Sequence, residues 1–138
     1  MTATRVKTCV ITGYGINCEK EVASACQMAG SDVSFIHAQK LFTDEFPWNE
    51  AHLIVFPGGF SFGDELGAGK TFANRITYNS LNLRDKLHTF ANRGNCILGI
   101  CNGFQILLEA GLLPGAMKRN DSLHFISKYH TLKVVNTD

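Results

Sequence analysis

The sequence predicts an α/β domain with a mostly parallel sheet and helices on both faces. Short apolar runs rich in β-branched residues alternate along the chain with segments of helical periodicity. Turns that contain glycine separate the two kinds of segment. The length of 138 residues and the hydrophobic content of 45% suit one domain with a buried core.

Four segments have the composition of strands, namely residues 6–12, 32–37, 53–56 and 96–100. The last two are apolar throughout, which is typical of strands buried on both faces of a parallel sheet. The stretch at 123–135 has the pattern of two further short strands and breaks the alternation of strand and helix.

Helices are predicted where apolar residues recur three and four positions apart. The first should begin after Asn17, which can cap it, and should bury Val22, Ala25, Cys26 and Ala29 on one face. The other three are predicted at residues 71–78, 83–91 and 104–110, with Gly94 and Gly111 ending the last two.

The charge balance excludes several classes of partner. A net charge of +1 without any basic run predicts no binding to nucleic acid or to an anionic membrane surface. The purely apolar runs are much shorter than the roughly 18 residues that a membrane-spanning helix needs. The N-terminus lacks the apolar stretch of a signal peptide, so we expect a cytoplasmic chain.

The cysteine count predicts reduced thiols. Five cysteines is an odd number, and their spacing matches neither a zinc site nor a redox pair. We therefore expect most of them to be buried packing residues and expect no metal site.

Two glycine-rich stretches resemble nucleotide-binding loops without meeting their requirements. At residues 13–18 the third glycine of a dinucleotide fingerprint is replaced by Cys18, and His37 stands where an acidic ribose ligand is expected. At residues 63–71 a phosphate-binding loop would need glycine where Asp64 stands, because Gly63 is one position too early. We expect an ordinary turn at the first stretch and a solvated Lys70 at the second.

A third glycine-rich stretch, Gly99-Ile100-Cys101-Asn102-Gly103, has the form of a nucleophile elbow with cysteine as the nucleophile. Its glycines are needed because side chains beside the nucleophile would collide with neighbouring backbone. The turn should place the Cys101 sulfur at the N-terminus of the next helix, where the helix dipole favours a thiolate. The N–H of Asn102 should help to bind an oxyanion.

Five segments extend this signal over nearly the whole chain: GINCE at 15–19, PGGFSFGD at 57–64, LGICNGFQIL at 98–107, GLLPG at 111–115 and RNDS at 119–122. Together they resemble the class I (triad) glutamine amidotransferases and, within them, the family of glutaminase subunits of phosphoribosylformylglycinamidine synthase. The resemblance implies a flavodoxin-like fold. It implies also that residues 1–138 form a single, incomplete glutamine amidotransferase domain.

The resemblance implies a reaction and its residues. Cys101 would attack the side-chain amide of glutamine, and water would then hydrolyse the resulting thioester. The N–H groups of Gly59 and Asn102 would form the oxyanion hole, and Gln105 would hold the substrate. Ammonia would pass to a large synthetase subunit in de novo purine synthesis; ATP and magnesium are expected on that partner, and no cofactor in this chain.

One part of the family pattern is missing. The family places its catalytic His and Glu well after the nucleophile, and the sequence ends at Asp138 without either segment. A cysteine nucleophile needs a base to protonate the departing ammonia, so the resemblance implies a truncated chain that is inactive alone. Such a chain should expose a sheet edge and self-associate through it.

The sequence leaves three other hypotheses about function open. The chain could be a non-catalytic remnant or binding module of the same fold. It could instead belong to the neighbouring superfamily of cysteine-elbow proteins with protease, deglycase or chaperone roles, where Glu19 would be the acidic partner of the cysteine. A nucleotide hydrolase is the least favoured reading, because it depends on the poor phosphate-loop match at residues 63–71.

Overall fold

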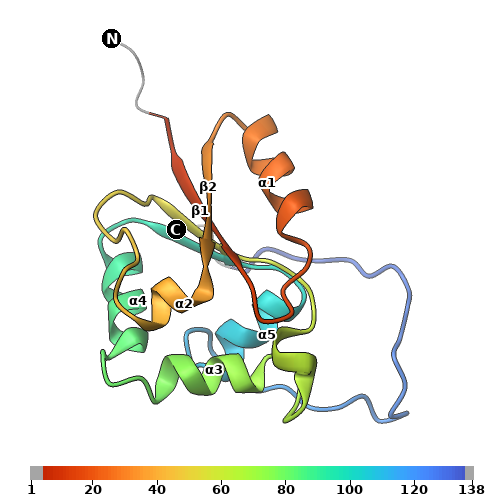
Figure 1. Cartoon of the computed structure of the whole chain (residues 1–138). Coiled ribbons are helices and arrows are strands. Elements are labelled where there is room, and N and C mark those ends of the chain that lie inside the picture. The colour runs from red at the N-terminus through yellow and green to blue at the C-terminus, as the bar shows by residue number, and fades with distance from the viewer. Residues whose placement is uncertain (1–4, 136–138) are drawn as a thin grey trace.

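A computed structural model describes residues 5–135 of the chain. Its centre is a sheet of four parallel strands in the spatial order β2-β1-β3-β4 (Figure 1). The strands are β1 (Lys7–Thr12), β2 (Asp32–His37), β3 (Leu53–Phe56) and β4 (Cys96–Gly99). The α/β class and the parallel sheet predicted from the sequence are confirmed.

The two central strands supply the buried part of the sheet. Val10 of β1 lies opposite Val55 of β3, and both are fully buried on one face. Ile11 and Ile54 point to the other face, because successive side chains of a strand alternate between faces. The apolar composition of these strands therefore serves two separate cores.

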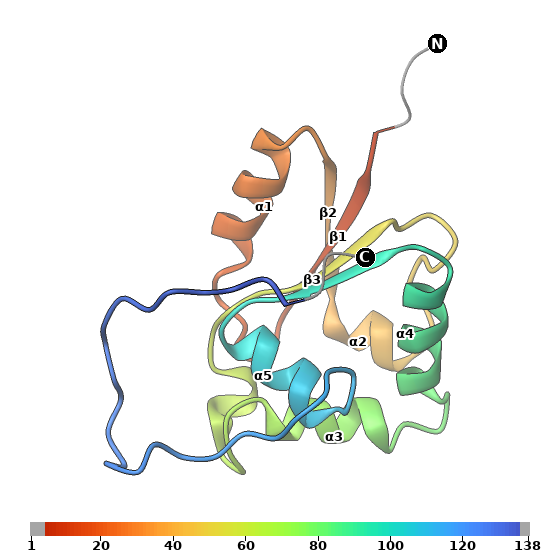
Figure 2. The same ribbon diagram turned by 180° about the vertical axis from the view of Figure 1, so that it is seen from behind.

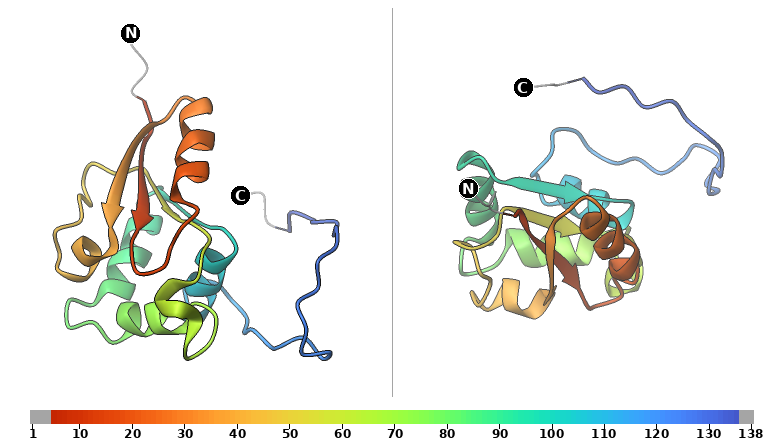
Figure 3. Two further views of the ribbon diagram at one scale, coloured as in Figure 1. Left: turned by 45° about the vertical axis from the view of Figure 1, so that its right-hand side comes forward. Right: turned by 90° about the horizontal axis from the view of Figure 1, so that it is seen from above.

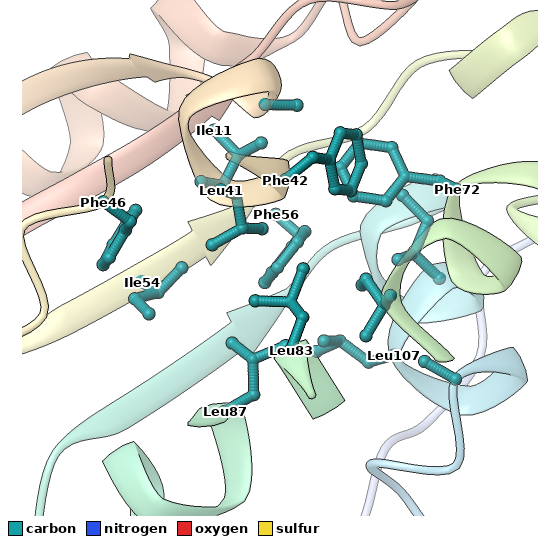
Figure 4. Close-up of a cluster of buried hydrophobic side chains, with 14 of the residues drawn as sticks. Ile11, Leu41, Phe42, Phe46, Ile54, Phe56, Phe72, Leu83, Leu87 and Leu107 are labelled. Carbon is teal, nitrogen blue, oxygen red and sulfur yellow. The ribbon is translucent and has the colours of Figure 1, made fainter. Parts of the chain in front are cut away.

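The helices divide unequally between the two faces (Figure 3). Among the described helices, α1 (Glu19–Met28) alone packs with Val10 and Val55, forming a small core on one face. The larger core lies on the other face, where Phe56, Leu41 and Leu87 are among the side chains that meet (Figure 4). The remaining helices are α2 (Ala38–Phe42), α3 (Lys70–Thr77), α4 (Leu83–Asn92), α5 (Asn102–Glu109) and the short 3-10 helix η1 (Ser61–Asp64).

Two details of the predicted helices are wrong. In α1 the buried residues are Val22 and Ala23, which pack with Val10 of β1 and Val55 of β3, whereas Ala25 and Ala29 lie outside this contact and are exposed. Asn17 makes no capping hydrogen bond; Cys18 directly precedes the helix. Helix α2 was not predicted, and its N-terminus is capped by the His37 side chain, which accepts from the Gln39 N–H at 3.1 Å.

Strand β4 is less buried than its apolar sequence predicts. It pairs with β3 on one side and with no other described strand, which makes it an edge. Leu98 is 44% exposed and Ile100 42% exposed, because α1 covers β1 and β2 rather than this edge. The prediction of a strand here is confirmed, and the prediction that it is buried is wrong.

The two strands predicted at 123–135 are absent from the structure. This part of the chain runs as an exposed, irregular segment (Figure 2). It pairs with no other strand in the described part of the chain, and an extended segment without a neighbour cannot form the hydrogen-bond ladder that defines a strand. Of the described helices, none has the length and apolar character to cross a membrane.

Candidate active site at the cysteine elbow

Cys101 occupies a strained turn at the carboxyl edge of the sheet. It lies between the end of β4 and the first residue of α5, with φ of 53° and ψ of −113°. Few residues other than glycine adopt a positive φ, so this backbone costs energy that the surrounding fold must supply. The thiol side chain is exposed. This is the elbow geometry that the glycine spacing predicted.

The glycines on either side of Cys101 are required by contacts. A Cβ added to Gly103 would lie 1.7 Å from the Phe56 carbonyl oxygen, and one added to Gly99 would lie 2.7 Å from the Gly103 carbonyl oxygen. Both distances are far below any contact that a side chain can make. Only glycine at both positions lets α5 start directly against β3 and β4, as the sequence analysis expected.

A second loop, residues 57–60, follows β3 and lies beside the elbow. A Cβ added to Gly58 would come within 3.4 Å of the Cys101 Cβ. Gly59 has φ of 144°, and a Cβ there would lie 2.6 Å from the Gly15 carbonyl oxygen. The loop therefore fits tightly between Cys101 and the turn after β1.

That turn, residues 13–18, holds the second loop in place. The N–H groups of Asn17 and Cys18 both donate to the Gly58 carbonyl at 3.2 Å, and the Phe60 N–H donates to the Gly15 carbonyl at 2.9 Å. Sequence reasoning treated the stretch as an ordinary strand-to-helix turn and missed this role. The signal would have been its glycines, which permit close approach of another backbone.

Two backbone N–H groups near Cys101 have no internal acceptor among the described residues. Within residues 5–135, neither the Gly59 N–H nor the Asn102 N–H donates a hydrogen bond. Free N–H groups beside a nucleophile can stabilise an oxyanion, as the sequence analysis proposed for these two residues. The structure brings both amides to the same edge as Cys101.

The Asn102 side chain connects the elbow at Cys101 to the loop after β3. It is 1% exposed, and its Oδ1 accepts from the Ser61 N–H at 2.9 Å. Its Nδ2 donates to Asp64 Oδ1 at 3.0 Å and to Gln105 Oε1 at 3.2 Å. Sequence reasoning assigned Asn102 only a backbone role and missed this network, which joins residues about forty positions apart.

Gln105 also lines a cavity of about 420 Å³ beside α5. Lys70, Lys118 and Arg119 contribute positive charge to its wall, and Glu109 a negative one. A somewhat larger cavity of about 520 Å³ lies between Trp48 and α4, and Cys101 does not line it. Cys101 does not line the Gln105 cavity either, but the wall of this cavity carries more positive than negative charge, as a small molecule with a carboxylate requires.

The structure supplies no base for Cys101 among the described residues. The imidazole nitrogens of His37 and His52 accept from the backbone N–H groups of Gln39 and Lys7. His88 lies exposed on α4, and His124 and His130 lie in the exposed segment after α5. Within residues 5–135 no group of three metal-binding side chains is present.

Among residues 5–135, Glu19 makes no hydrogen bond to the Cys101 thiol. Its Oε2 is buried and has no hydrogen-bond partner in the described part of the chain. The geometry that a cysteine-elbow protein of the protease, deglycase and chaperone group would need is therefore missing.

In the stretch at 63–71, the Asp64 carboxylate occupies a backbone N–H that a phosphate group would need. Asp64 Oδ1 accepts from the Gly69 N–H at 3.1 Å, so this amide is not free for a phosphate group. Lys70 is exposed at the start of α3. Both observations agree with the expectation that the loop does not bind nucleotides.

The five cysteines are free, but fewer are buried than expected. Only Cys9 is buried, and Cys26 is half-buried. Burial, with a smaller contribution from the negative charge of Glu50, raises the pKa of the Cys9 thiol to about 11. Cys18, Cys96 and Cys101 are exposed, so the expectation that most cysteines pack in the core is wrong.

Comparison with known proteins gives a family match over residues 5–138, to the model of the CobB/CobQ-like glutamine amidotransferase domain. A phosphoribosylformylglycinamidine synthase subunit PurQ from Methanococcus maripaludis strain C5 is 47% identical over 106 residues, which are 77% of this chain and 38% of that protein. The protein of the same name from Sulfurimonas denitrificans is 39% identical over 133 residues, which are 96% of this chain and 55% of that protein.

A solved structure shares the fold. The chain aligns with the structure of PurLQS from Thermotoga maritima with a TM-score of 0.68 and 34% sequence identity, covering 86% of this chain and 50% of that one. This chain thus spans about half the length, or less, of the relatives described above.

Proposed function

The chain belongs to the CobB/CobQ-like glutamine amidotransferase family, and from this premise we propose that it is part of a glutaminase in which Cys101 attacks the side-chain amide of glutamine. The observation that carries the proposal is the strained, exposed Cys101 beside two free N–H groups, those of Gly59 and Asn102. A nucleophile and an oxyanion hole are two of the parts that acyl transfer requires.

The reaction follows from this arrangement. The Cys101 sulfur adds to the amide carbon of glutamine, and the carbonyl oxygen takes up negative charge between the two N–H groups. The carbon–nitrogen bond breaks, ammonia leaves with a proton, and a glutamyl thioester remains. Water then attacks the thioester, releasing glutamate and returning the thiol.

The Gln105 cavity is our candidate for the site that binds the substrate carboxylate. We propose that Gln105 and the cations around it, among them Lys70 and Arg119, hold the α-carboxylate end of glutamine. Cys101 does not line this cavity, so the substrate would have to extend from it past Gln105, in the first turn of α5, to place its amide at the nucleophile.

Complete turnover needs a base that the described residues do not place at Cys101. We expect this chain by itself to form the thioester and to hydrolyse glutamine very slowly, because departing ammonia must be protonated. The base of the working enzyme would be supplied by residues other than those described.

The relatives indicate where the ammonia goes. They carry the name of a subunit of phosphoribosylformylglycinamidine synthase, and the solved structure contains PurLQS. We propose that the whole protein, in the cytoplasm, passes ammonia to a synthetase subunit in purine biosynthesis. ATP and magnesium would act on that partner, and this chain would hold no cofactor.

Self-association through β4 is a further part of the proposal. The outer edge of β4 presents unpaired backbone groups, which pair readily with the same edge of a second copy. Sedimentation velocity should show a dimer that grows with concentration and that Leu98→Lys removes. A chain that stays monomeric at high concentration would contradict this part.

The central test is labelling with a glutamine-like electrophile, read by intact mass and peptide mapping. We expect a single adduct on Cys101 that excess glutamine suppresses, with Cys96 as the exposed internal control, because the Cys18 sulfur lies beside Gly58 and so close to the site. Labelling spread over the three exposed cysteines, or insensitive to glutamine, would favour a non-catalytic module of the same fold.

A further inference from the structure

We propose that Asp64 is a positioning residue that fixes the oxyanion hole by orienting the Asn102 side chain. The inference rests on the proposed glutaminase function and adds to it a residue that touches neither the nucleophile nor the substrate. Asp64 connects the loop after β3 to the start of α3, five residues later, and to the start of α5, 38 residues later.

The carboxylate dictates which way the buried amide faces. An ionised Asp64 can only accept hydrogen bonds, so the Asn102 group that faces it at 3.0 Å must be the NH₂. The Asn102 oxygen is thereby turned to the Ser61 N–H, which can only donate. Because the Asp64 carboxylate can only accept and the Ser61 N–H can only donate, the Asn102 amide has one orientation that satisfies both.

This orientation joins the two oxyanion donors to each other. Ser61 is two residues from Gly59, whose N–H is one donor, and Asn102 itself carries the other. The Ser61–Asn102 bond is buried, with Ser61 0% and Asn102 1% exposed, so water cannot replace it. A loose Asn102 side chain would let the loop carrying Gly59 drift from the elbow.

Asp64 is itself held by the fold. Its second hydrogen bond is from the Gly69 N–H, and Gly69 presses against α5 so closely that an added Cβ would lie 2.7 Å from the Ile106 nitrogen. The loop between Asp64 and Gly69 is thus closed against the helix that carries the site. Residues 63–71, which resemble a phosphate-binding loop in sequence, thus hold Asp64 in place against α5.

The backbone conformation at Asp64 allows substitutions that remove the carboxylate without straining the chain. Asp64 has φ of 52°, which glycine adopts freely and asparagine tolerates well. Asp64→Gly therefore removes the carboxylate without adding strain. Asp64→Asn keeps an oxygen in the place of Oδ1, which accepts from both the Gly69 N–H and Asn102 Nδ2, and its αL backbone is preserved. Glu65→Ala is the matched control, because Glu65 is the exposed neighbour without a hydrogen bond to the site.

The probe is glutaric semialdehyde, an aldehyde with the carbon skeleton and terminal carboxylate of glutamine. The thiol of Cys101 adds across the carbonyl: a carbon–sulfur bond forms, the carbon–oxygen double bond becomes single, and the thiol proton ends on the oxygen. That oxygen occupies the oxyanion hole, so affinity, measured by carbon-13 NMR of the labelled aldehyde carbon, reports on the two donors. Iodoacetamide is the reference reagent, because displacement at its saturated carbon needs no oxyanion hole.

We expect Asp64→Gly to weaken aldehyde binding at least about tenfold. Its iodoacetamide rate should stay within about twofold of wild type, as a positioning role predicts. Asp64→Asn should recover most of the affinity, and Glu65→Ala should match wild type. Equal affinity of Asp64→Gly and wild type, failure of Asp64→Asn to rescue, or loss of folding in Asp64→Gly would each overturn the inference. A wild-type chain that alkylates normally but takes up no aldehyde would reject the proposed function itself, and the inference with it.

Discussion

Two regions of the chain with similar apolar content have opposite environments. In the packed region, up to the end of α5, Phe56 and Phe72 are fully buried. In the segment at 113–135, Phe125 is 91% exposed and Leu132 92% exposed. Both regions alternate apolar with polar residues. The difference shows that such a pattern becomes a strand only where a neighbouring strand and a core receive it.

The largest expected effect tests this contrast directly. Phe72→Ala should lower the free energy of unfolding by about 3–5 kcal/mol, because it opens a cavity among the rings of Phe42, Phe56 and Phe62. Phe125→Ala should change it by less than about 0.5 kcal/mol. Urea denaturation followed by the fluorescence of Trp48, which packs on Phe90, measures both.

A large loss of unfolding free energy in Phe125→Ala would show that the segment at 113–135 packs in solution, and would contradict the contrast with the packed region. A small loss in Phe72→Ala would show that the larger core collapses around the cavity.

An intermediate loss of stability is expected from substituting glycines. Gly103, in the packed elbow, is compared with Gly94, in an open turn. Gly103→Ala should destabilise the chain by about 1–3 kcal/mol, because the new methyl group meets the Phe56 carbonyl. It should also slow labelling of Cys101 by the glutamine-like electrophile at least about tenfold, since the turn must shift. Gly94→Ala, with φ of 86° and no atom within 4 Å of the new methyl, should cost about 1–2 kcal/mol.

Labelling of Cys101 should be unaffected by Gly94→Ala. If both glycine variants slow labelling equally, loss of general stability rather than the geometry of the elbow would account for the effect.

The parts predicted correctly from sequence are those whose cause is local. Runs of apolar residues located β1 and β3, and glycine spacing located the elbow at Cys101, because each depends on a few consecutive residues. The family resemblance was confirmed over nearly the whole chain.

The rest depends on contacts between distant segments. The exposure of Leu98 follows from where α1 happens to lie, and α2 forms because Ala38 and Leu41 reach the larger core. The bond between Ser61 and Asn102 exists only once the loops after β3 and β4 lie side by side. Neither local propensity nor spacing carries this information.

The smallest expected effect compares a buried with an exposed thiol. Because the fold raises the pKa of Cys9 from 9.0 to about 11, the folded chain keeps a proton that the unfolded chain releases. Stability from the neutral Cys9 thiol is therefore complete below pH 9 and falls as the pH rises toward 11. Cys9→Ala should flatten this alkaline loss of the melting temperature, whereas Cys96→Ala, at an exposed site, should follow wild type. An identical alkaline slope in all three chains would mean that Cys9 ionises as readily in the folded as in the unfolded chain, and that its burial in β1 does not protect it.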